Sequence, residues 1–223
     1  MYEVIPGILE KEWSAIEQKI ELVRPFAKTI HIDILDGTFA QNTTFLDPAP
    51  FLKYAKDPPA GEAGFFLELH MMVDNPLQYL KPFANAGFKR FLGHIEKMPD
   101  PVEFIAQAQL LGEAWLAIDG PTPIDAIKVP IEDLDGILVM TINAGFSGQQ
   151  LVPQHLDKVK VLRSKIDTLP AEMQIPIEVD GGINDQTIAL AKQSGATRFV
   201  ATSFLFNSNN PQEQYKKLLD QIS

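Results

Sequence analysis

Short apolar runs alternate with longer amphipathic segments along the whole chain. The apolar runs have the length and the β-branched or leucine-rich composition of buried strands. They cover residues 2–6, 28–35, 65–73, 88–95, 114–119, 135–142, 175–180 and 197–202. The segments that follow them are predicted to be helical, over residues 10–24, 48–56, 76–86, 100–112, 122–128, 153–168, 184–194 and 210–221. The pattern therefore predicts a strand–helix unit repeated eight times.

The predicted helices carry local signals of their own. In residues 10–24 the apolar side chains recur every three or four positions, which marks one buried face at Trp13, Ile16, Ile20 and Val23. Gly87 and Gly195 each follow the last turn of a predicted helix, where glycine commonly ends a helix. Asn184 precedes another predicted helix and is expected to cap its N-terminus.

This alternation predicts an α/β fold, a (β/α)8 TIM barrel, with a doubly wound open sheet as the alternative. A chain of 223 residues with 45% hydrophobic content is long enough for one well-buried core. Length alone also permits two small domains, but the chain has no repeat, low-complexity segment or linker. We therefore expect one barrel domain over residues 1–223, with residues 58–61 (PPAG) as a short loop insertion.

Composition narrows the class of partner. With 19 basic and 29 acidic residues the chain has a formal charge of −10, which disfavours nucleic acid and anionic membrane surfaces as partners. Cysteine is absent, so disulfides and thiolate ligands are excluded. We see no signal peptide and no apolar run of transmembrane length, and we expect a cytoplasmic protein. A phosphorylated substrate would have to be held by local backbone dipoles rather than by long-range attraction.

Two histidines and two aspartates lie where three predicted strands end. His31 and Asp33 point to the same side of their strand because side chains alternate with a period of two. His70 and Asp180 lie near the ends of two further strands, and a barrel gathers its strand ends at one mouth. Two imidazoles and two carboxylates suit one divalent transition metal, which could be zinc, iron, manganese or cobalt. Taken singly, each histidine is more often a core residue, and Asp180 before two glycines is more often a turn residue.

A third histidine closes the fourth predicted strand. His94 and Glu96 alternate in the same way as His31 and Asp33. The pair could orient a metal ligand from behind, or it could be a partly buried polar pair of no further consequence. The sequence leaves both interpretations open.

Glycine-bearing turns follow the sixth and seventh predicted strands, at residues 143–149 (NAGFSGQ) and 180–184 (DGGIN). Glycine lets backbone N–H groups come close to an anion, and barrels often bind phosphate in the loops after their last strands. The loop after the eighth strand adds Thr202 and Ser203, and the Ser203 hydroxyl could donate to phosphate. Most two-glycine turns are simple turns, yet two in neighbouring loops favour a phosphate site.

At these positions the chain resembles the ribulose-phosphate 3-epimerase family over nearly its whole length. The family pattern H-x-D-x-M-D-G appears as residues 31–37 (HIDILDG), and the H-L-M pattern as residues 70–72 (HMM). The V-M-x-V-N-P-G-F-x-G-Q pattern appears as residues 139–149 (VMTINAGFSGQ), and V-D-G-G-I as residues 179–183. The last two matches fall on the turns already singled out.

The resemblance implies a metal-dependent isomerase that inverts C3 of a ketose phosphate, most simply D-ribulose 5-phosphate to D-xylulose 5-phosphate in the pentose phosphate pathway. It implies one cation on His31, Asp33, His70 and Asp180, with Asp33 and Asp180 also moving the proton and the cation stabilising an enediolate. Implied contacts to substrate or phosphate are His70, Gly145, Phe146, Ser147, Gly148, Gly181, Gly182, Thr202 and Ser203. Met72 and Met140 match methionines that the family places beside the intermediate, although ordinary core packing would also explain them. Family members are often homo-oligomers, and we expect the same here.

Several rim positions depart from the family pattern. Glu10 stands where the family has a serine that contacts substrate, and Thr202 replaces a glycine. Ala144 replaces a proline, and Asp119 an asparagine. Residues 41–46 (QNTTFL) replace P-N-x-T-x-G. These changes leave the reaction type in place and open the question of the substrate.

Three other functions compete with the ribulose-phosphate assignment. One is a 3-epimerase of allulose 6-phosphate, and another is a non-catalytic barrel that binds a sugar phosphate. Retention of both Asp33 and Asp180 argues against the latter, because binding alone needs no acid–base pair. A related decarboxylase group uses D-x-K-x-x-D, but Leu35 stands at the lysine position, so we discount it.

Overall fold

The computed structural model describes residues 2–55 and 64–223. The predicted loop at residues 58–61 and the last residue of the predicted helix at 48–56 lie outside these ranges. Among the described residues, no helix combines the length and the apolar composition needed to cross a bilayer.

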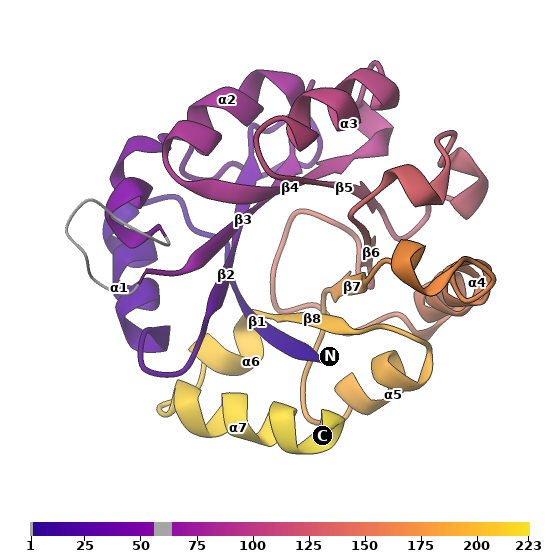
Figure 1. Ribbon diagram of the computed structural model, residues 1–223. Coiled ribbons are helices and arrows are strands. Elements are labelled where there is room, and N and C mark those ends of the chain that lie inside the picture. Colours follow the sequence, from indigo (N-terminus) through magenta and orange to yellow (C-terminus); the bar gives the residue numbers. More distant parts are fainter. Residues whose placement is uncertain (1, 56–63) are drawn as a thin grey trace.

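Eight parallel strands close into a barrel in chain order, as the alternating pattern predicts (Figure 1). The strands are β1 (Glu3–Ile8), β2 (Thr29–Leu35), β3 (Phe66–Met72), β4 (Phe88–His94), β5 (Glu113–Ile118), β6 (Gly136–Met140), β7 (Ile177–Asp180) and β8 (Arg198–Ala201). Each pairs in parallel with both neighbours, including β1 with β8. All carboxyl ends therefore meet at one mouth, where barrel enzymes carry their active sites.

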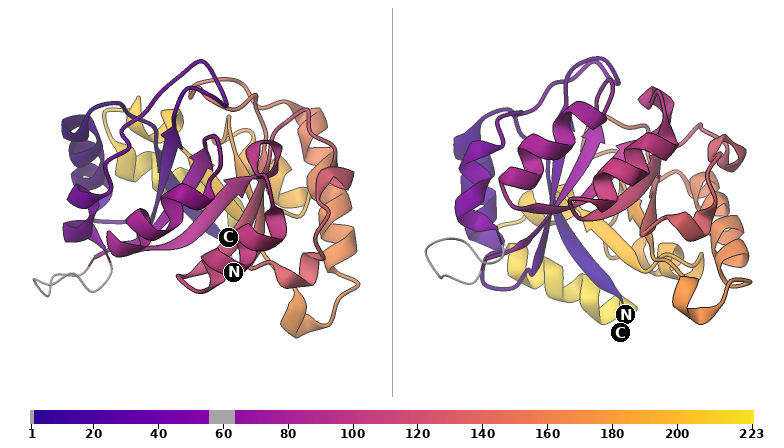
Figure 2. Two further views of the ribbon diagram at one scale, coloured as in Figure 1. Left: turned by 90° about the horizontal axis from the view of Figure 1, so that it is seen from above. Right: turned by 45° about the horizontal axis from the view of Figure 1, so that its top comes forward.

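Helices surround the barrel on its outside (Figures 1 and 2). They are α1 (Trp13–Val23), α2 (Leu77–Asn85), α3 (Pro101–Gln109), α4 (Leu156–Ile166), α5 (Ile188–Gln193), α6 (Ser203–Phe206) and α7 (Pro211–Ile222). On α1 the predicted face is buried at Ile16, Ile20 and Val23. Gly87 and Gly195 have the positive φ expected after a helix end. The ends of the chain lie close together in both views of Figure 2.

Two predicted helices are 3-10 turns instead. The segment predicted as a helix over residues 122–128 forms a short turn at Ile124–Ala126, and a second turn follows at Ile131–Asp133. Each turn begins directly after a proline, Pro123 or Pro130. Proline offers no N–H to a preceding carbonyl and disfavours α geometry at the residue before it, so a helix begun after Pro123 cannot continue past Pro130. The segment near residue 50 likewise forms a 3-10 helix, Ala49–Tyr54, with Pro48 at its start.

The other helix boundaries move by a few residues. Helix α1 begins at Trp13 rather than at residue 10, and α5 begins at Ile188 because residues 185–187 form a turn. Asn184 does not cap α5 itself, but its Oδ1 accepts from the backbone N–H groups of Gln186 and Thr187 in the preceding turn. Helix α6 was not predicted.

The interior of the barrel holds a layer of buried charges below the mouth. Glu68 pairs with Arg90 at 2.6 Å and with Arg198 at 3.3 Å, and Arg198 also pairs with Glu178 at 2.9 Å. Both glutamates are fully buried. In the strand register Glu68 lies between His31 and Arg90. Buried charges are tolerated only when paired, so this layer forms a polar floor for the residues above it.

Candidate metal centre and active site

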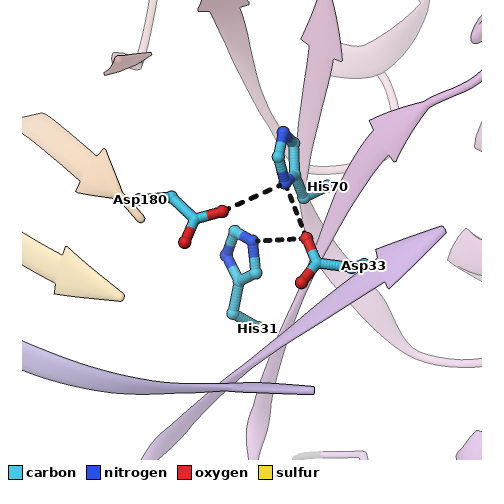
Figure 3. Close-up of side chains that lie close together, drawn as sticks. All are labelled: His31, Asp33, His70 and Asp180. Carbon is cyan, nitrogen blue, oxygen red and sulfur yellow. Dashed lines mark hydrogen bonds and ion pairs between the residues drawn. The ribbon is translucent and has the colours of Figure 1, made fainter. Parts of the chain in front are cut away.

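Four side chains converge at the mouth of the barrel, and they are the four predicted as metal ligands (Figure 3). β2 carries His31 and Asp33, β3 carries His70, and β7 ends at Asp180. One nitrogen or oxygen from each lies within 4.8 Å of the others, and all four residues are buried. Asp180 and Asp33 point toward the two imidazoles from different sides (Figure 3).

His31 presents an unsatisfied nitrogen to this cluster. Its Nδ1 lies 2.8 Å from Oε1 of Glu68 and 3.3 Å from Oε1 of Glu178. Its Nε2 is buried without a hydrogen-bond partner among the described residues, 3.3 Å from Oδ1 of Asp33. A buried polar atom without a partner is costly unless a ligand satisfies it. Together with the donor set, this nitrogen fits a divalent transition metal.

His70 is held at both ring nitrogens. Its Nδ1 lies 2.7 Å from Oδ1 of Asp33 and 3.7 Å from Oδ2 of Asp180. Its Nε2 lies 2.9 Å from Nε2 of His94. The ring therefore has no freedom to turn away from the two aspartates.

The buried groups of the cluster shift one another's pKa values. Burial acts to raise the pKa of Asp33, but the neighbouring His31 and His70 imidazoles outweigh it and lower that pKa. Burial, assisted by the Asp33 carboxylate, raises the pKa of Asp180 to about 7. Burial acts to lower the pKa of His31, but Asp33 and the two glutamates raise it well above its ordinary value. A divalent cation among these atoms would replace the protons that the groups share.

Two buried threonines hold the backbone at the aspartates. The Thr44 hydroxyl donates to the carbonyl of Asp33 at 3.0 Å and accepts from the N–H of Leu35 at 2.9 Å. The Thr141 hydroxyl contacts the carbonyls of Asp180 at 2.9 Å and Gly181 at 2.5 Å. Threonine side chains are short and stiff at χ1, so these hydroxyls fix the backbone from which the two aspartate side chains project.

A cavity opens above the cluster. The cavity is lined by Asp33, Asp180, Met72 and Met140 and by every predicted loop residue: Gly145, Phe146, Ser147, Gly148, Gly181, Gly182, Thr202 and Ser203. Leu9, Ile142, Ile183 and Val200, which were not predicted, complete the wall.

Glu10 does not line this cavity. Its carboxylate pairs with Lys19 of α1 at 2.6 Å, and the Lys19 ammonium lies over the ring of Phe206. The negative charge of Glu10, which departs from the family pattern, is therefore paired with the Lys19 ammonium.

The glycines of the mouth adopt backbone conformations that need glycine. Gly181 and Gly182 have φ of +116° and +69°. A Cβ on Gly182 would lie 2.3 Å from the backbone nitrogen of Leu151, so no other residue fits there without movement. The carbonyl of Gly145 accepts from the Asn42 side chain at 2.8 Å, which ties the loop at residues 143–149 to the loop after β2.

The remaining departures from the family pattern contact neighbouring residues. Asp119 accepts from the backbone N–H of Ala144 at 3.1 Å, a bond that proline at position 144 could not make. Thr202 fills space beside Gly7, where a Cβ on that glycine would lie 2.5 Å from the threonine hydroxyl. These changes are accommodated at the rim without disturbing the four-residue cluster.

Comparison with known sequences decides the family. The sequence profile of the Ribulose-phosphate 3 epimerase family matches residues 3–206. The chain belongs to this family. It is 32% identical over 224 residues to the ribulose-phosphate 3-epimerase of Bacillus subtilis, covering 100% of this chain and 98% of that one. It is 31% identical over 210 residues to that of Mycobacterium tuberculosis, covering 93% and 87%.

Solved structures agree on the fold. A 3-keto-L-gulonate-6-phosphate decarboxylase from Vibrio cholerae superposes with a TM-score of 0.67 at 14% identity, covering 100% of this chain and 98% of that one. An orotidine 5'-phosphate decarboxylase from Pyrococcus horikoshii gives a TM-score of 0.62 at 19% identity, covering 98% of both chains. At such low identity these likenesses concern the barrel alone. As a member of the ribulose-phosphate 3-epimerase family, the chain is an isomerase of pentose phosphate metabolism.

The glutamates behind His31 were missed by sequence reasoning. Glu68 stands two residues before His70, and Glu178 two residues before Asp180. The same period of two that placed His31 and Asp33 on one side of β2 would have placed each glutamate on the side of its strand's ligand. Their contact with His31, however, depends on which residues of neighbouring strands pair in the closed barrel, and this pairing cannot be read from the sequence.

Proposed function

We propose that this protein is a divalent-cation-dependent 3-epimerase that interconverts D-ribulose 5-phosphate and D-xylulose 5-phosphate. One observation carries the proposal: Asp33 and Asp180 come from β2 and β7, line one cavity, and contact the same imidazole. Inversion at C3 needs a base on one face of the substrate and an acid on the other. Two carboxyl groups in one cavity supply both.

The aspartates would move the proton. One carboxylate removes the C3 proton, which lies alpha to the C2 carbonyl, and leaves a planar enediolate. The other carboxyl group delivers a proton to the opposite face, so that C3 is inverted. After one turnover the two groups have exchanged protonation states, and exchange with water resets them. Thr44 and Thr141 hold the backbone of the two aspartates during these transfers.

His31, Asp33, His70 and Asp180 would hold the cation. When bound, a divalent cation supplies Lewis-acid stabilisation of the negative charge that develops on the substrate oxygens. His31 contributes Nε2 because Glu68 and Glu178 face its Nδ1. This donor set suits zinc, iron, manganese or cobalt, and availability would decide among them.

The phosphate would bind at the glycine-bearing end of the cavity. Gly145 and Gly148 on one loop, and Gly181 and Gly182 on the next, all have positive φ and line the cavity. Such backbone lets N–H groups converge on an anion without charged side chains. Local dipoles of this kind suit a protein whose net charge of −10 repels phosphate at long range.

The test is exchange of the substrate C3 proton with solvent in deuterated water. Ribulose 5-phosphate and allulose 6-phosphate are assayed in parallel, with metal-stripped protein and with protein reloaded with Mn²⁺, Co²⁺, Fe²⁺ or Zn²⁺. Cation-dependent exchange with ribulose 5-phosphate is expected. Exchange with allulose 6-phosphate alone would identify a hexulose phosphate, rather than ribulose 5-phosphate, as the substrate. Binding of either sugar without exchange would overturn the proposal in favour of a non-catalytic sugar-phosphate-binding barrel.

A further inference from the structure

His94 closes β4 behind the metal-ligand cluster and is fully buried. Its Nε2 lies 2.9 Å from Nε2 of His70, and its Nδ1 lies 2.9 Å from Oε2 of Glu96. The other oxygen of Glu96 accepts from the backbone N–H of Asp119 at 2.7 Å. The ring of Phe39 packs against the His94 ring with centroids 4.5 Å apart. His70, His94 and Glu96 therefore form a continuous hydrogen-bonded chain covered by an aromatic ring.

When a cation takes the place of the proton between Asp33 and Nδ1 of His70 and both imidazoles are neutral, this hydrogen-bonded chain admits one proton arrangement. An ionised Glu96 only accepts, so Nδ1 of His94 must donate to it. Burial disfavours a charged imidazole, so Nε2 of His94 carries a lone pair. Two nitrogens 2.9 Å apart need one proton between them, and Nε2 of His70 must supply it. That leaves Nδ1 of His70 unprotonated.

This Nδ1 is the atom that faces the aspartates, 2.7 Å from Oδ1 of Asp33 and 3.7 Å from Oδ2 of Asp180. We infer that His94 and Glu96 are positioning residues that keep the proton of His70 on Nε2 and so present Nδ1 as a metal ligand. The inference rests on the proposed cation site and adds two residues to it. His31 follows the same logic with the opposite nitrogen, since Glu68 faces its Nδ1 and leaves Nε2 toward the cluster.

The arrangement makes a prediction that simple packing does not. A phenylalanine at position 94 keeps ring volume but cannot accept from His70, so the His70 proton is free to move to Nδ1 and donate to Asp33. A glutamine at position 94 keeps an acceptor oxygen near the place of Nε2. Loss of such an outer partner typically weakens metal affinity by about 10- to 100-fold. The ability of residue 94 to accept a hydrogen bond from His70, rather than the size of its side chain, should therefore determine the affinity for the cation.

The experiment titrates the full-length, metal-stripped protein with Co²⁺ and follows its visible absorption. We expect His94→Phe to weaken Co²⁺ affinity by about tenfold or more and His94→Gln to stay within about threefold of the unchanged protein. Glu96→Gln leaves a single acceptor oxygen for the two donors His94 and Asp119 N–H, so it should weaken Co²⁺ affinity severalfold, and it serves if His94→Phe does not fold. Leu92→Val, another buried change on β4, is the packing control and should bind as the unchanged protein does.

Two outcomes separate this inference from the proposed function. If the unchanged protein binds no Co²⁺, the cation site itself is wrong and the inference falls with it. If the unchanged protein binds Co²⁺ and both His94→Phe and Glu96→Gln bind it equally well, the positioning role is overturned while the cation site stands. Side-chain ¹⁵N NMR of the Zn²⁺-loaded protein adds a direct readout. A proton on Nε2 of His70 is expected, and a proton on Nδ1 would contradict the inference.

Discussion

Oδ1 of Asp33 lies 2.7 Å from Nδ1 of His70, with both side chains buried at the mouth of the barrel. A carboxylate oxygen and an unprotonated imidazole nitrogen repel each other at this distance unless a proton or a cation attracts both. The contact therefore places Asp33 in two proposed roles at once, as a ligand and as a group that exchanges protons with the substrate.

Asp33→Asn tests the two roles together. The amide keeps the size of the side chain but cannot take up the C3 proton. We expect C3 exchange to fall by about 10²- to 10⁴-fold, as general-base removal does elsewhere, while the protein stays folded. The measurement is deuterium incorporation followed by NMR. Asp157→Asn, on the exposed face of α4, is the matched control and should exchange normally. Full exchange by Asp33→Asn would remove Asp33 from the mechanism.

Cation removal should destabilise the folded protein. A ligand that binds only the native state adds about 2.7 kcal/mol when present at a hundredfold excess over its Kd. For a chain of this size that corresponds to a rise in Tm of about 5–10 °C. Calorimetry with a chelator and with added Mn²⁺ or Zn²⁺ measures the difference. A double substitution of His31 and His70 by glutamine should abolish the cation-dependent rise, and its persistence would place the cation elsewhere.

Arg198→Met should be strongly destabilising. Arg198 contacts Glu178 at 2.9 Å, Glu3 at 2.6 Å and Glu68 at 3.3 Å, so its removal leaves two buried carboxylates short of a partner. Breaking a buried pair from one side typically costs about 3–5 kcal/mol. Urea denaturation gives the free energy of unfolding. Lys160→Met, which breaks the exposed pair with Asp157, should cost less than about 1 kcal/mol. Equal costs for the two variants would refute the buried network.

Gly182→Ala should impair phosphate binding more than Gly148→Ala. Both glycines have positive φ, but an added Cβ at Gly182 meets backbone 2.3 Å away, whereas one at Gly148 meets nothing within 4 Å. Alanine at 182 therefore forces the loop to move, while alanine at 148 adds only backbone strain of about 1 kcal/mol. Inhibition of C3 exchange by inorganic phosphate reports on the site. The prediction fails if the two variants lose phosphate inhibition to the same extent.

The sequence predicted the barrel and the members of its cluster because both follow from short-range periodicity. Alternation along β2 places His31 and Asp33 on one side, and strand ends of a parallel barrel meet at one mouth. The positive φ of Gly181 and Gly182 is likewise a local property. Chemistry that depends only on which residue ends which strand can be predicted from the chain alone.

Two of the features that could not be predicted depend on contacts between side chains of different elements. Glu10 stands where the family has a serine that contacts substrate, yet its carboxylate pairs with Lys19 on the following helix and Glu10 does not line the cavity. The two interpretations of His94 differed only in whether its ring reaches His70, which is set by the register of β3 and β4. The third difference is local: the apolar residues of the crossover between β5 and β6 predict a helix, but Pro130 interrupts it and two 3-10 turns form instead.

Glu96 should make stability depend on acid pH. Burial acts to raise its pKa, but hydrogen bonds from His94 and from the backbone N–H of Asp119 outweigh this and lower the pKa to about 2. A carboxyl group with a depressed folded pKa stabilises the fold above its unfolded pKa of about 4.5, and that contribution is lost as pH falls toward 2. After allowance for solvent screening of this partly exposed side chain, we expect about 1 kcal/mol at pH 7.

The measurement is the free energy of unfolding of the chelator-treated protein and of Glu96→Gln between pH 7 and pH 3. The unchanged protein should be more stable at pH 7, and the difference should shrink as pH falls below about 5. Glu213→Gln, which removes a carboxylate exposed on α7, should show no such convergence. A gap between the unchanged protein and Glu96→Gln that stays constant over this pH range would show that the Glu96 carboxylate gains nothing from His94 in the folded state.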